Sequence, residues 1–430
     1  MNKINIGLIG YGNVGQGVVK LLKKRRNFVK AKYDAEFILK TLCDRSVHKK
    51  DTKDLEKTLL TTSYNDVLND PEIKVVIELI GGLNPAREIV TKALQQGKHV
   101  ITANKELIAN HGKELFPLAR QHNAYLYFES CVGAGIPIIS TITQGMAGNK
   151  FNALYGIING TCNFILTKMT QDNLSFAQAL EEAQRLGFAE KDPTLDINGM
   201  DSTHKLAILA YLTFGKFLDV KNIYTEGISH ISHDDIEYAE SLGLTIKLLG
   251  IAKRVNEEIE VRVHPTLFSK EHPLASINNV YNAIFLNADP LGNILISGEG
   301  AGQMSAAIGV FGDLINLSSR GDKEQLLCNY FTEDEKLLVR SSENFRTKFY
   351  LRFTASDKPG VLSQITGILG KYNIGINSVT QKAHNPMASV PVIMLTDYTV
   401  DHSLREALAE IHKLPVVKAK TVAIRMEKLW

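Results

Sequence analysis

The sequence has few cysteines, no long apolar run and no large excess of charge of either sign. Its four cysteines (Cys43, Cys131, Cys162 and Cys328) are scattered without metal-ligand spacing, which favours a reduced, cytoplasmic protein. No segment has the form of a secretory signal or the length to cross a bilayer, so we expect no membrane partner. The formal net charge is +3 with mixed signs along the chain, which argues against a nucleic-acid partner.

The length and composition indicate a soluble globular protein with more than one domain. A chain of 430 residues is too long for one ordinary core. The hydrophobic fraction of 44% and the charged fraction of 22% are ordinary for such proteins. We therefore expect two or three domains.

A glycine-rich turn follows the first apolar strand, in "INIGLIGYGNVGQGVVKLLKKRR". Gly10 permits a tight turn, Gly12 lets the backbone approach a pyrophosphate, and Gly15 allows close packing of helix on strand. The N-terminus of the following helix supplies N–H donors for the phosphates. The expected cofactor contacts in this turn are Gly10, Tyr11, Gly12, Asn13, Val14 and Gly15.

The second strand, "EFILKTLC", ends at Asp44 and Arg45. An acid at this place accepts from the ribose hydroxyls of NAD, whereas an arginine suits the 2′-phosphate of NADP. Both residue types are present, so the sequence predicts a dinucleotide and leaves the choice between NAD and NADP open.

Further strands bring polar residues to the same edge of the predicted parallel sheet. The apolar run 74–82 reads as a buried strand, a helix is predicted over 85–96, and the strand "HVITA" runs into Asn104 and Lys105. Polar residues at the carboxyl ends of such strands face the cofactor cleft, so Lys105 is a candidate site residue.

The segment "ESCVGAGIPIIST" contains one carboxylate and an irregular, glycine-rich backbone. Exposed carbonyl oxygens with one carboxylate suit a hard cation. The candidate ligands are Glu129 and the carbonyls of Val132, Ala134 and Ile136. The alternative is a glycine-rich crossover between two domains without an ion.

Four carboxylates crowd the stretch "EKDPTLDINGMDSTHK" at 190–205, just before an apolar helix. Asp201 and Lys205 are four residues apart and share a helix face. An exposed ion pair of this kind stabilises little, but carboxylates beside a half-buried helix need cationic partners. A substrate ammonium is one such partner, and a lysine in this setting can transfer a proton.

At this point the chain resembles the homoserine dehydrogenase family. "GFAEKDPTLDINGMD…K" is similar to that family's signature, and so, in order, are "GLIGYGNVGQGVV", "ITANK", "ESCVGAGIPII" and "NGTCNFIL". The resemblance covers roughly residues 4–320. Phe188 and Ala189 depart from it, because tyrosine and threonine are frequent there.

The resemblance implies the reversible NAD(P)-dependent conversion of L-aspartate 4-semialdehyde to L-homoserine, in threonine, methionine and isoleucine biosynthesis. It implies Lys205 as the proton donor and Lys105 near the nicotinamide and the substrate. It also implies a sodium ion at the site of Glu129. The implied substrate contacts are Glu190, Asp196, Asp201 and Thr161, and Gly302 lies in a second glycine loop over the cofactor.

The C-terminal segment reads as strand, helix, strand, strand, helix, strand, which is a ferredoxin-like βαββαβ arrangement. "DKPGVL" and "NIGINSV" resemble an ACT domain, which implies an amino-acid effector bound near Asp357, Gly360 and Asn377. Threonine is the expected effector. The alternative is that this domain only mediates oligomerisation.

The predicted fold is α/β: a Rossmann-type parallel-sheet domain, an α+β domain for substrate binding and dimerisation, and a C-terminal ferredoxin-like ACT domain. The boundaries are 1–130, completed by a segment near 300–320, then 131–320, a linker at 321–347, and 348–430. We expect a homodimer or homotetramer. Two alternatives are an aspartate-semialdehyde dehydrogenase that uses Cys131 or Cys162, and a non-catalytic nucleotide and amino-acid sensor.

Overall fold

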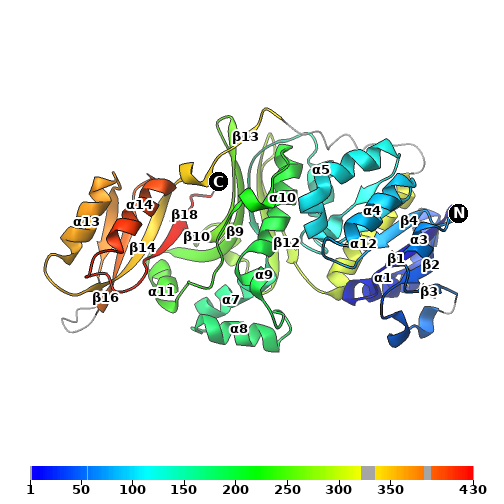
Figure 1. Cartoon of the computed structure of the whole chain (residues 1–430), viewed down its shortest axis with the longest axis horizontal. Coiled ribbons are helices and arrows are strands. Elements are labelled where there is room, and N and C mark those ends of the chain that lie inside the picture. The colour runs from blue at the N-terminus through cyan, green and yellow to red at the C-terminus, as the bar shows by residue number, and fades with distance from the viewer. Residues whose placement is uncertain (1, 56, 321–334, 382–388, 430) are drawn as a thin grey trace.

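The computed structural model describes residues 2–55, 57–320, 335–381 and 389–429. Three domains follow one another along the longest axis of the molecule (Figure 1). The N-terminal domain lies at one end, the C-terminal domain at the other, and the middle domain joins them.

The first domain is a six-stranded parallel sheet in the order β3-β2-β1-β4-β5-β6. Its strands read as nearly continuous apolar runs because helices cover both faces; all four residues of β4 are buried. The strands are β1 (Asn2–Ile9), β2 (Ala35–Cys43), β3 (Leu59–Thr61), β4 (Val75–Glu78), β5 (His99–Thr102) and β6 (Leu126–Tyr127). The helices are α1 (Asn13–Lys24), α2 (Arg26–Tyr33), α3 (Asn65–Leu68), α4 (Ala86–Gln95) and α5 (Lys105–Gln121).

Helix α12 (Gln303–Arg320) returns from the middle domain and packs on the first one. Its buried residues Ala307, Val310 and Phe311 share a core with Ile6 and Val18. A side chain at Gly17 of α1 would lie 2.8 Å from the Cβ of Ala307, so the two helices approach closely. A segment far along the chain therefore completes the nucleotide-binding domain.

The middle domain is an antiparallel sheet in the order β12-β11-β7-β9-β10, with helices packed on it. Helix α10 is buried over most of its length, as the apolar run after Lys205 predicts. The strands are β7 (Lys150–Ile157), β8 (Tyr224–Thr225), β9 (Leu244–Val255), β10 (Glu258–Ser269), β11 (Tyr281–Asp289) and β12 (Gly292–Glu299). The helices are α6 (Ile138–Ser140), α7 (Gly160–Gln171), α8 (Phe176–Arg185), α9 (Thr194–Ile197), α10 (Met200–Phe214) and α11 (His233–Ser241).

The third domain has the predicted ferredoxin-like order β18-β14-β16-β15, with every neighbouring pair antiparallel. Its elements are β14 (Arg346–Ser356), α13 (Val361–Lys371), β15 (Ile376–Thr380), β16 (Ser389–Thr396), β17 (Thr399–Val400), α14 (Asp401–Ile411) and β18 (Val422–Met426). The sequence "HNPM" between β15 and β16 favours a turn, but it falls outside the described residues. Strand β18 also pairs in parallel with β10, so one sheet runs through both domains.

The segment expected as a linker differs from that expectation in its described part. Residues 335–347 include β13 (Leu338–Val339), which pairs in parallel with β10. Leu337 is buried, and β14 already begins at Arg346. The apolar residues Leu337, Leu338 and Val339 form too short a run to predict a strand, and the polar residues on either side concealed it. Residues 321–334 fall outside the described part of the chain.

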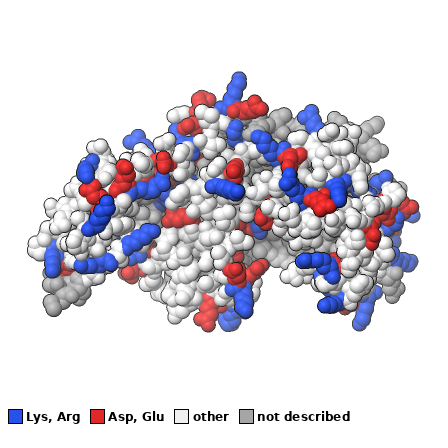
Figure 2. All heavy atoms as spheres, viewed as in Figure 1, with Lys and Arg blue, Asp and Glu red and all other residues white. Residues whose placement is uncertain are grey.

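Charged side chains of both signs are interspersed over the face in Figure 2. This agrees with the small net charge of +3. Among the helices of the described residues, none combines the length and apolarity needed to span a bilayer.

Candidate active site

The turn between β1 and α1 has the backbone geometry that a nucleotide-binding loop requires. Gly10 has a φ of +102°, and a side chain there would lie 2.6 Å from the carbonyl oxygen of Leu79. A side chain at Gly15 would overlap the carbonyl oxygen of Gly10, whereas the space beside Gly12 is open. Gly12 therefore leaves room for phosphate, while Asn13 and Val14 form the first turn of α1.

A cavity of about 430 Å³ adjoins this turn and is lined by Gly10, Gly12, Asp44, Arg45 and Gly81, among others. The Asp44 carboxylate already accepts hydrogen bonds at 2.7–2.9 Å from Lys50, Ser46 and the backbone N–H of Tyr11. Although burial alone would raise the pKa of Asp44, these donors lower it. Arg45 is exposed at the rim. The sequence did not single out Lys50, which lies six residues beyond Asp44.

A second cavity, of about 710 Å³, lies between the first and middle domains. It brings together residues that are far apart in the sequence. The predicted site residues that line it are Lys105, Ala134, Thr161, Glu190, Asp196, Asp201, Lys205 and Gly302. Asp192, the remaining carboxylate of the acidic stretch, instead accepts hydrogen bonds from the backbone and hydroxyl of Thr194.

Asp201 lies between two lysines in this cavity. Its Oδ1 is 2.8 Å from the Nζ of Lys105, and its Oδ2 is 2.7 Å from the Nζ of Lys205. Asp201 is 6% exposed, and burial alone would raise the pKa of its carboxyl, but the two ammonium groups lower it well below the usual range. Burial alone would likewise lower the pKa of Lys105, but Asp201 raises it. The Asp201 carboxylate and the Lys105 ammonium thus stabilise each other's ionised forms.

Two helix starts position these lysines. Asn104 caps α5 by accepting from the N–H of Leu107 at 3.1 Å, which places Lys105 in the first turn. Lys205 lies one turn after Asp201 on α10, and its Nζ also donates to the carbonyl of Ile158 at 2.8 Å. Lys205 is therefore fixed by α10 and by the end of β7.

Asn159 is a site residue that the sequence reading missed. Its Nδ2 donates to Asp196 at 2.7 Å and to Asp201 at 2.8 Å, and it is 4% exposed. Its Oδ1 accepts from the N–H of Cys162 and caps α7. An asparagine in the turn between a strand and a helix was the available signal, but only the structure shows that it joins two carboxylates.

The other end of the cavity combines hydroxyl, carboxylate and apolar groups. The hydroxyl of Thr161 donates to the carbonyl of Phe188 at 2.7 Å and lies 3.2 Å from Oδ2 of Asp196. Glu190 is exposed at the rim. The ring of Phe188 is half exposed and lies 5.1 Å from that of Phe164. A small molecule with ammonium, hydroxyl and aliphatic parts would find partners for each.

The segment around Glu129 is a buried carboxylate centre. The two oxygens of Glu129 accept from the N–H groups of Ile139 and Ser140 at 2.7 and 2.9 Å. The N–H of Glu129 donates to Asp313 at 3.1 Å. Burial raises the pKa of both carboxyls, and the charge of Glu129 raises that of Asp313 further. Val132, Ala134 and Ile136 follow in the same buried loop, where the Ile136 carbonyl accepts from the N–H of Ile138.

Comparisons with known proteins agree with this geometry. Residues 10–129 match the family model described as "Homoserine dehydrogenase, NAD binding domain", residues 137–315 match "Homoserine dehydrogenase", and residues 349–414 match "ACT domain". The chain is 39% identical to the homoserine dehydrogenase of Pseudomonas aeruginosa and 37% identical to that of Neisseria gonorrhoeae, with 100% of each chain covered.

The chain belongs to the homoserine dehydrogenase family. A solved homoserine dehydrogenase from Thiobacillus denitrificans is 39% identical, with a TM-score of 0.91 and 99% of each chain covered. A hyperthermophilic archaeal homoserine dehydrogenase, solved in complex with NADPH, is 27% identical with a TM-score of 0.63, over 73% of this chain and 97% of that one. The resemblance read from the sequence, the fold class and the oxidoreductase class are thereby confirmed.

The alternative of an aspartate-semialdehyde dehydrogenase requires Cys131 or Cys162 as a nucleophile. The surroundings of both cysteines are unsuitable for this role. Cys131 and Cys162 are both buried, and burial raises the pKa of each thiol well above its usual range. Cys162 donates to the carbonyl of Asp196 at 3.2 Å. A thiolate nucleophile needs a lowered pKa, so these thiols do not fit a covalent mechanism.

The predicted effector residues lie at one end of the ACT domain. Gly360, with a φ of +84°, precedes α13, and Asp357 accepts from the side chain of Gln381 at 3.1 Å. Asn377 is exposed on β15. The link between Asp357 and Gln381 joins the turn after β14 to the end of β15.

Proposed function

We propose that this enzyme reduces L-aspartate 4-semialdehyde to L-homoserine and catalyses the reverse oxidation, within threonine, methionine and isoleucine biosynthesis in the cytoplasm. The observation that carries this proposal is the cluster of Lys105, Asp201 and Lys205 in a cavity between the nucleotide-binding and middle domains. The adjoining carboxylates of Glu190 and Asp196 supply acceptors for the ammonium group of an amino acid.

The residues divide the chemistry among them. In the direction of reduction, Lys205 gives a proton to the aldehyde oxygen as it becomes an alkoxide. Asp201 holds the ammonium groups of Lys205 and Lys105 in place, so both charges face the reacting oxygen without reorganisation. Asp196, fixed by Asn159 and accompanied by Thr161, orients the substrate's amino end.

We propose that the loop of Gly10, Gly12 and Gly15 holds NAD(P), together with Gly302, which lines the cavity between the first and middle domains. When bound, the nicotinamide supplies a hydride in one direction and accepts it in the other. We propose NADP as the preferred form, because Asp44 is already hydrogen-bonded while Arg45 and Lys50 are cationic beside it. The archaeal relative bound to NADPH is in keeping with this choice.

We also propose that sodium binds at Glu129 with the carbonyls of Val132, Ala134 and Ile136. The donor set is oxygen only, which suits a hard monovalent cation. The fit is supported by the two neighbouring buried carboxylates, Glu129 and Asp313, which leave the centre short of positive charge. The ion would secure the loop that joins the two domains.

The ACT domain supports an amino-acid effector, for which we propose threonine bound near Asp357, Gly360 and Asn377. We further propose that the enzyme acts as a homodimer or homotetramer. Size-exclusion chromatography with light scattering distinguishes these states from a monomer.

The deciding experiment is an absorbance assay at 340 nm with L-homoserine and each nicotinamide in turn. We expect turnover with both and a higher kcat/KM with NADP. Parallel reactions with L-serine and L-threonine, which also carry a side-chain hydroxyl, test whether the activity is specific for homoserine. Lack of turnover of homoserine with either nucleotide, by folded protein, would refute the proposal.

A further inference from the structure

Glu78, the last residue of β4, is a fully buried carboxylate close to both cavities of the active site. Residues 79–81, which follow it, line the cavity beside the glycine turn. Its register partner on β5 is Thr102, and Lys105 beyond that strand lines the cavity between the first and middle domains. Glu78 itself lines neither cavity, so any role in the reaction must act through these neighbours.

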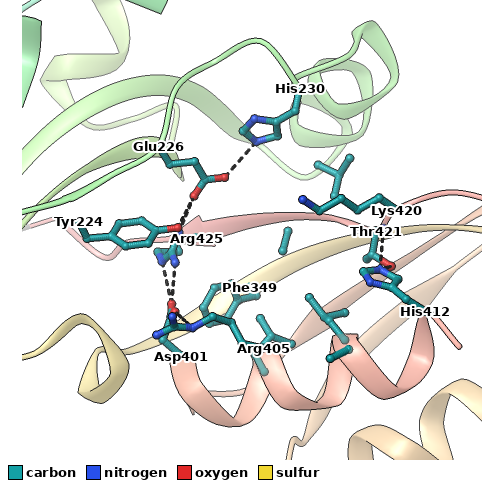
Figure 3. A pocket seen from close by; sticks show the side chains of 15 residues that line it. Tyr224, Glu226, His230, Phe349, Asp401, Arg405, His412, Lys420, Thr421 and Arg425 are labelled. Carbon is teal, nitrogen blue, oxygen red and sulfur yellow. Dashed lines mark hydrogen bonds and ion pairs between the residues drawn. The ribbon is translucent and has the colours of Figure 1, made fainter. Parts of the chain in front are cut away.

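Two other buried carboxylates of this protein are compensated by cations. Asp401, beside a cavity between the middle and ACT domains, is 2% exposed, and its Oδ1 lies 2.7 Å from the guanidinium of Arg425 (Figure 3). Asp201 lies between two lysines. The hydrogen-bond donors around Glu78 in the described part of the chain are instead all neutral. Since burying a carboxylate without a cation costs free energy, stability alone does not explain Glu78.

Glu78 belongs to a set of hydrogen bonds that joins the ends of β4 and β5. Its Oε1 accepts from the N–H of Ile80 at 2.8 Å, and its Oε2 accepts from the hydroxyl of Thr102 at 2.7 Å. The Thr102 hydroxyl in turn accepts from the N–H of Asn104 at 3.0 Å, and the side-chain amide of Asn104 donates to the carbonyl of Gly82 at 2.7 Å. Burial raises the pKa of Glu78, and its donors act against that rise by favouring the carboxylate.

One end of this set fixes the loop 79–82 at the cavity beside the glycine turn. The N–H of Leu79 donates to the carbonyl of Ile9 at 2.8 Å, which continues the pairing of β4 with β1. Gly81 and Gly82 then adopt φ values of +71° and +69°, so they lie in no helix or strand. The loop therefore depends on the bonds from Ile80 and Gly82 for its position.

The other end fixes Lys105. Asn104 caps α5 by accepting from the N–H of Leu107 at 3.1 Å, and its own N–H is held by the Thr102 hydroxyl. Lys105 is the next residue, and its Nζ lies 2.8 Å from Asp201. A displacement of the Asn104 backbone would therefore move the lysine with it.

We propose that Glu78 is a positioning residue that fixes Lys105 and the loop 79–82 relative to each other. One carboxylate then sets both a wall of the cavity beside the glycine turn and an ammonium group of the substrate cavity. The role requires two acceptor oxygens, because donors reach Glu78 from both strands and an amide offers only one acceptor. The effect on turnover rests on the proposed function, because reacting groups must be held in a productive geometry.

Glu78→Gln tests the whole arrangement. We expect the Kd for NADPH, measured with the full-length protein by NADPH fluorescence, to rise roughly fivefold or more, because the N–H of Ile80 loses a charged acceptor. The kcat/KM for homoserine should fall roughly tenfold or more as Lys105 is displaced. Glu181→Gln, an exposed carboxylate on α8 that lines neither cavity, is the matched control and should leave both values unchanged.

Thr102→Val removes only the hydroxyl that connects Glu78 to α5. We expect kcat/KM for homoserine to fall roughly fivefold or more, while the Kd for NADPH stays within about twofold of wild type. Thr102→Ser keeps the hydroxyl and should restore both values. In the double variant with Glu78→Gln, kcat/KM should fall no further than in Glu78→Gln alone, because both changes act through the same contact. Thr170→Val on α7, whose hydroxyl donates within its own helix, is the control.

Reductive methylation at neutral pH, followed by peptide mass spectrometry, reports on Lys105 without catalysis. Against the effect of burial, Asp201 raises the pKa of Lys105. A lysine displaced from that carboxylate loses its proton more readily and is methylated faster. We expect Lys105 to be labelled about twofold faster or more in Thr102→Val, and the exposed Lys49 to be labelled at the wild-type rate.

The proposal is overturned by wild-type kcat/KM and wild-type Lys105 labelling in Thr102→Val, by an unchanged Kd for NADPH in Glu78→Gln, or by losses of the two variants that simply add. A merely structural role would lower the fraction of active protein, and hence kcat, without moving Kd or KM. If Glu78→Gln does not fold, the comparison of Thr102→Val with Thr102→Ser decides. If homoserine is not turned over at all, the proposed function fails, while the Kd and labelling results still decide the role of Glu78.

Discussion

Oδ2 of Asp201 lies 2.7 Å from the Nζ of Lys205, one turn further along α10. The pair is only slightly exposed, with side-chain exposures of 7% for Asp201 and 12% for Lys205. Since the Lys205 ammonium is also held by the carbonyl of Ile158, its position is fixed before substrate enters. A proton donor with fixed geometry lowers the barrier because little reorganisation remains.

Lys205→Ala should lower kcat by roughly 10²–10⁴-fold, the usual contribution of a positioned proton donor. The Kd for nucleotide, measured by fluorescence titration, should stay unchanged because the glycine loop lies in the other domain. Lys270→Ala, an exposed lysine paired with Glu240, serves as the control and should keep full activity. Retention of kcat in Lys205→Ala would exclude the proton-transfer role.

Asp201→Asn should lower kcat/KM and shift its alkaline limb to lower pH. Asp201 raises the pKa of Lys105 against the opposing effect of burial. Without the carboxylate that pKa falls, so the ammonium is lost at lower pH as the solution becomes more basic. A pH profile of kcat/KM from pH 6 to 10 measures the shift, and an unmoved alkaline limb would contradict it.

Asn159→Ala should raise the KM for homoserine at least several-fold, because Asp196 and Asp201 lose a shared donor worth about 1–3 kcal/mol. Asn159→Ser retains an oxygen that can cap α7, so its Tm should stay closer to wild type while KM rises similarly. Asn152→Ala on β7, away from the cavity, is the matched control. A normal KM in both Asn159 variants would argue against the bridging role.

Arg45→Ala should raise the KM for NADP about tenfold or more and leave that for NAD nearly unchanged. The 2′-phosphate would lose its exposed guanidinium partner, a charge-assisted contact of about 1.5–3 kcal/mol. Lys49→Ala, an exposed cation in the same loop, controls for general charge. Equal effects on both nucleotides would assign Arg45 a non-selective role.

Sodium should raise the Tm of the wild-type protein relative to choline at equal ionic strength, because an ion that binds only the folded state stabilises it. Glu129→Gln should abolish this difference, whereas Glu271→Gln, at an exposed loop position, should preserve it. Differential scanning fluorimetry supplies the readout without substrate. Equal Tm values of the wild-type protein in sodium and in choline would refute the proposed sodium site.

Features that depend on local geometry were accessible from the sequence. The glycine turn, the spacing of Asp201 and Lys205, and the order of the ACT domain elements follow from periodicities of two and 3.6 residues and from glycine's freedom at positive φ. The capping box of Ser175 and Gln178 at the start of α8 is another such feature, because a serine followed three residues later by glutamine signals a helix start. These signals involve only a few neighbouring residues, so they do not depend on contacts with distant segments of the chain.

Contacts between distant segments needed the tertiary structure. The ion pair of Lys105 with Asp201 crosses a domain boundary. Lys50 beside Asp44, and the bridge from Asn159, join residues that no local pattern relates. A polar side chain in a loop can be solvated by water or bonded to another residue. Composition therefore does not reveal which polar side chains form contacts with one another.

The sequence by itself determined several strands and helices of the first domain, the element order of the ACT domain and the residue types of the site. Only the tertiary structure decided which charges neutralise one another, and that β10 and β18 join the middle and ACT domains in one sheet. The reason is that a buried charge acquires its partner through packing, and strand neighbours are chosen by backbone pairing between segments that are far apart along the chain.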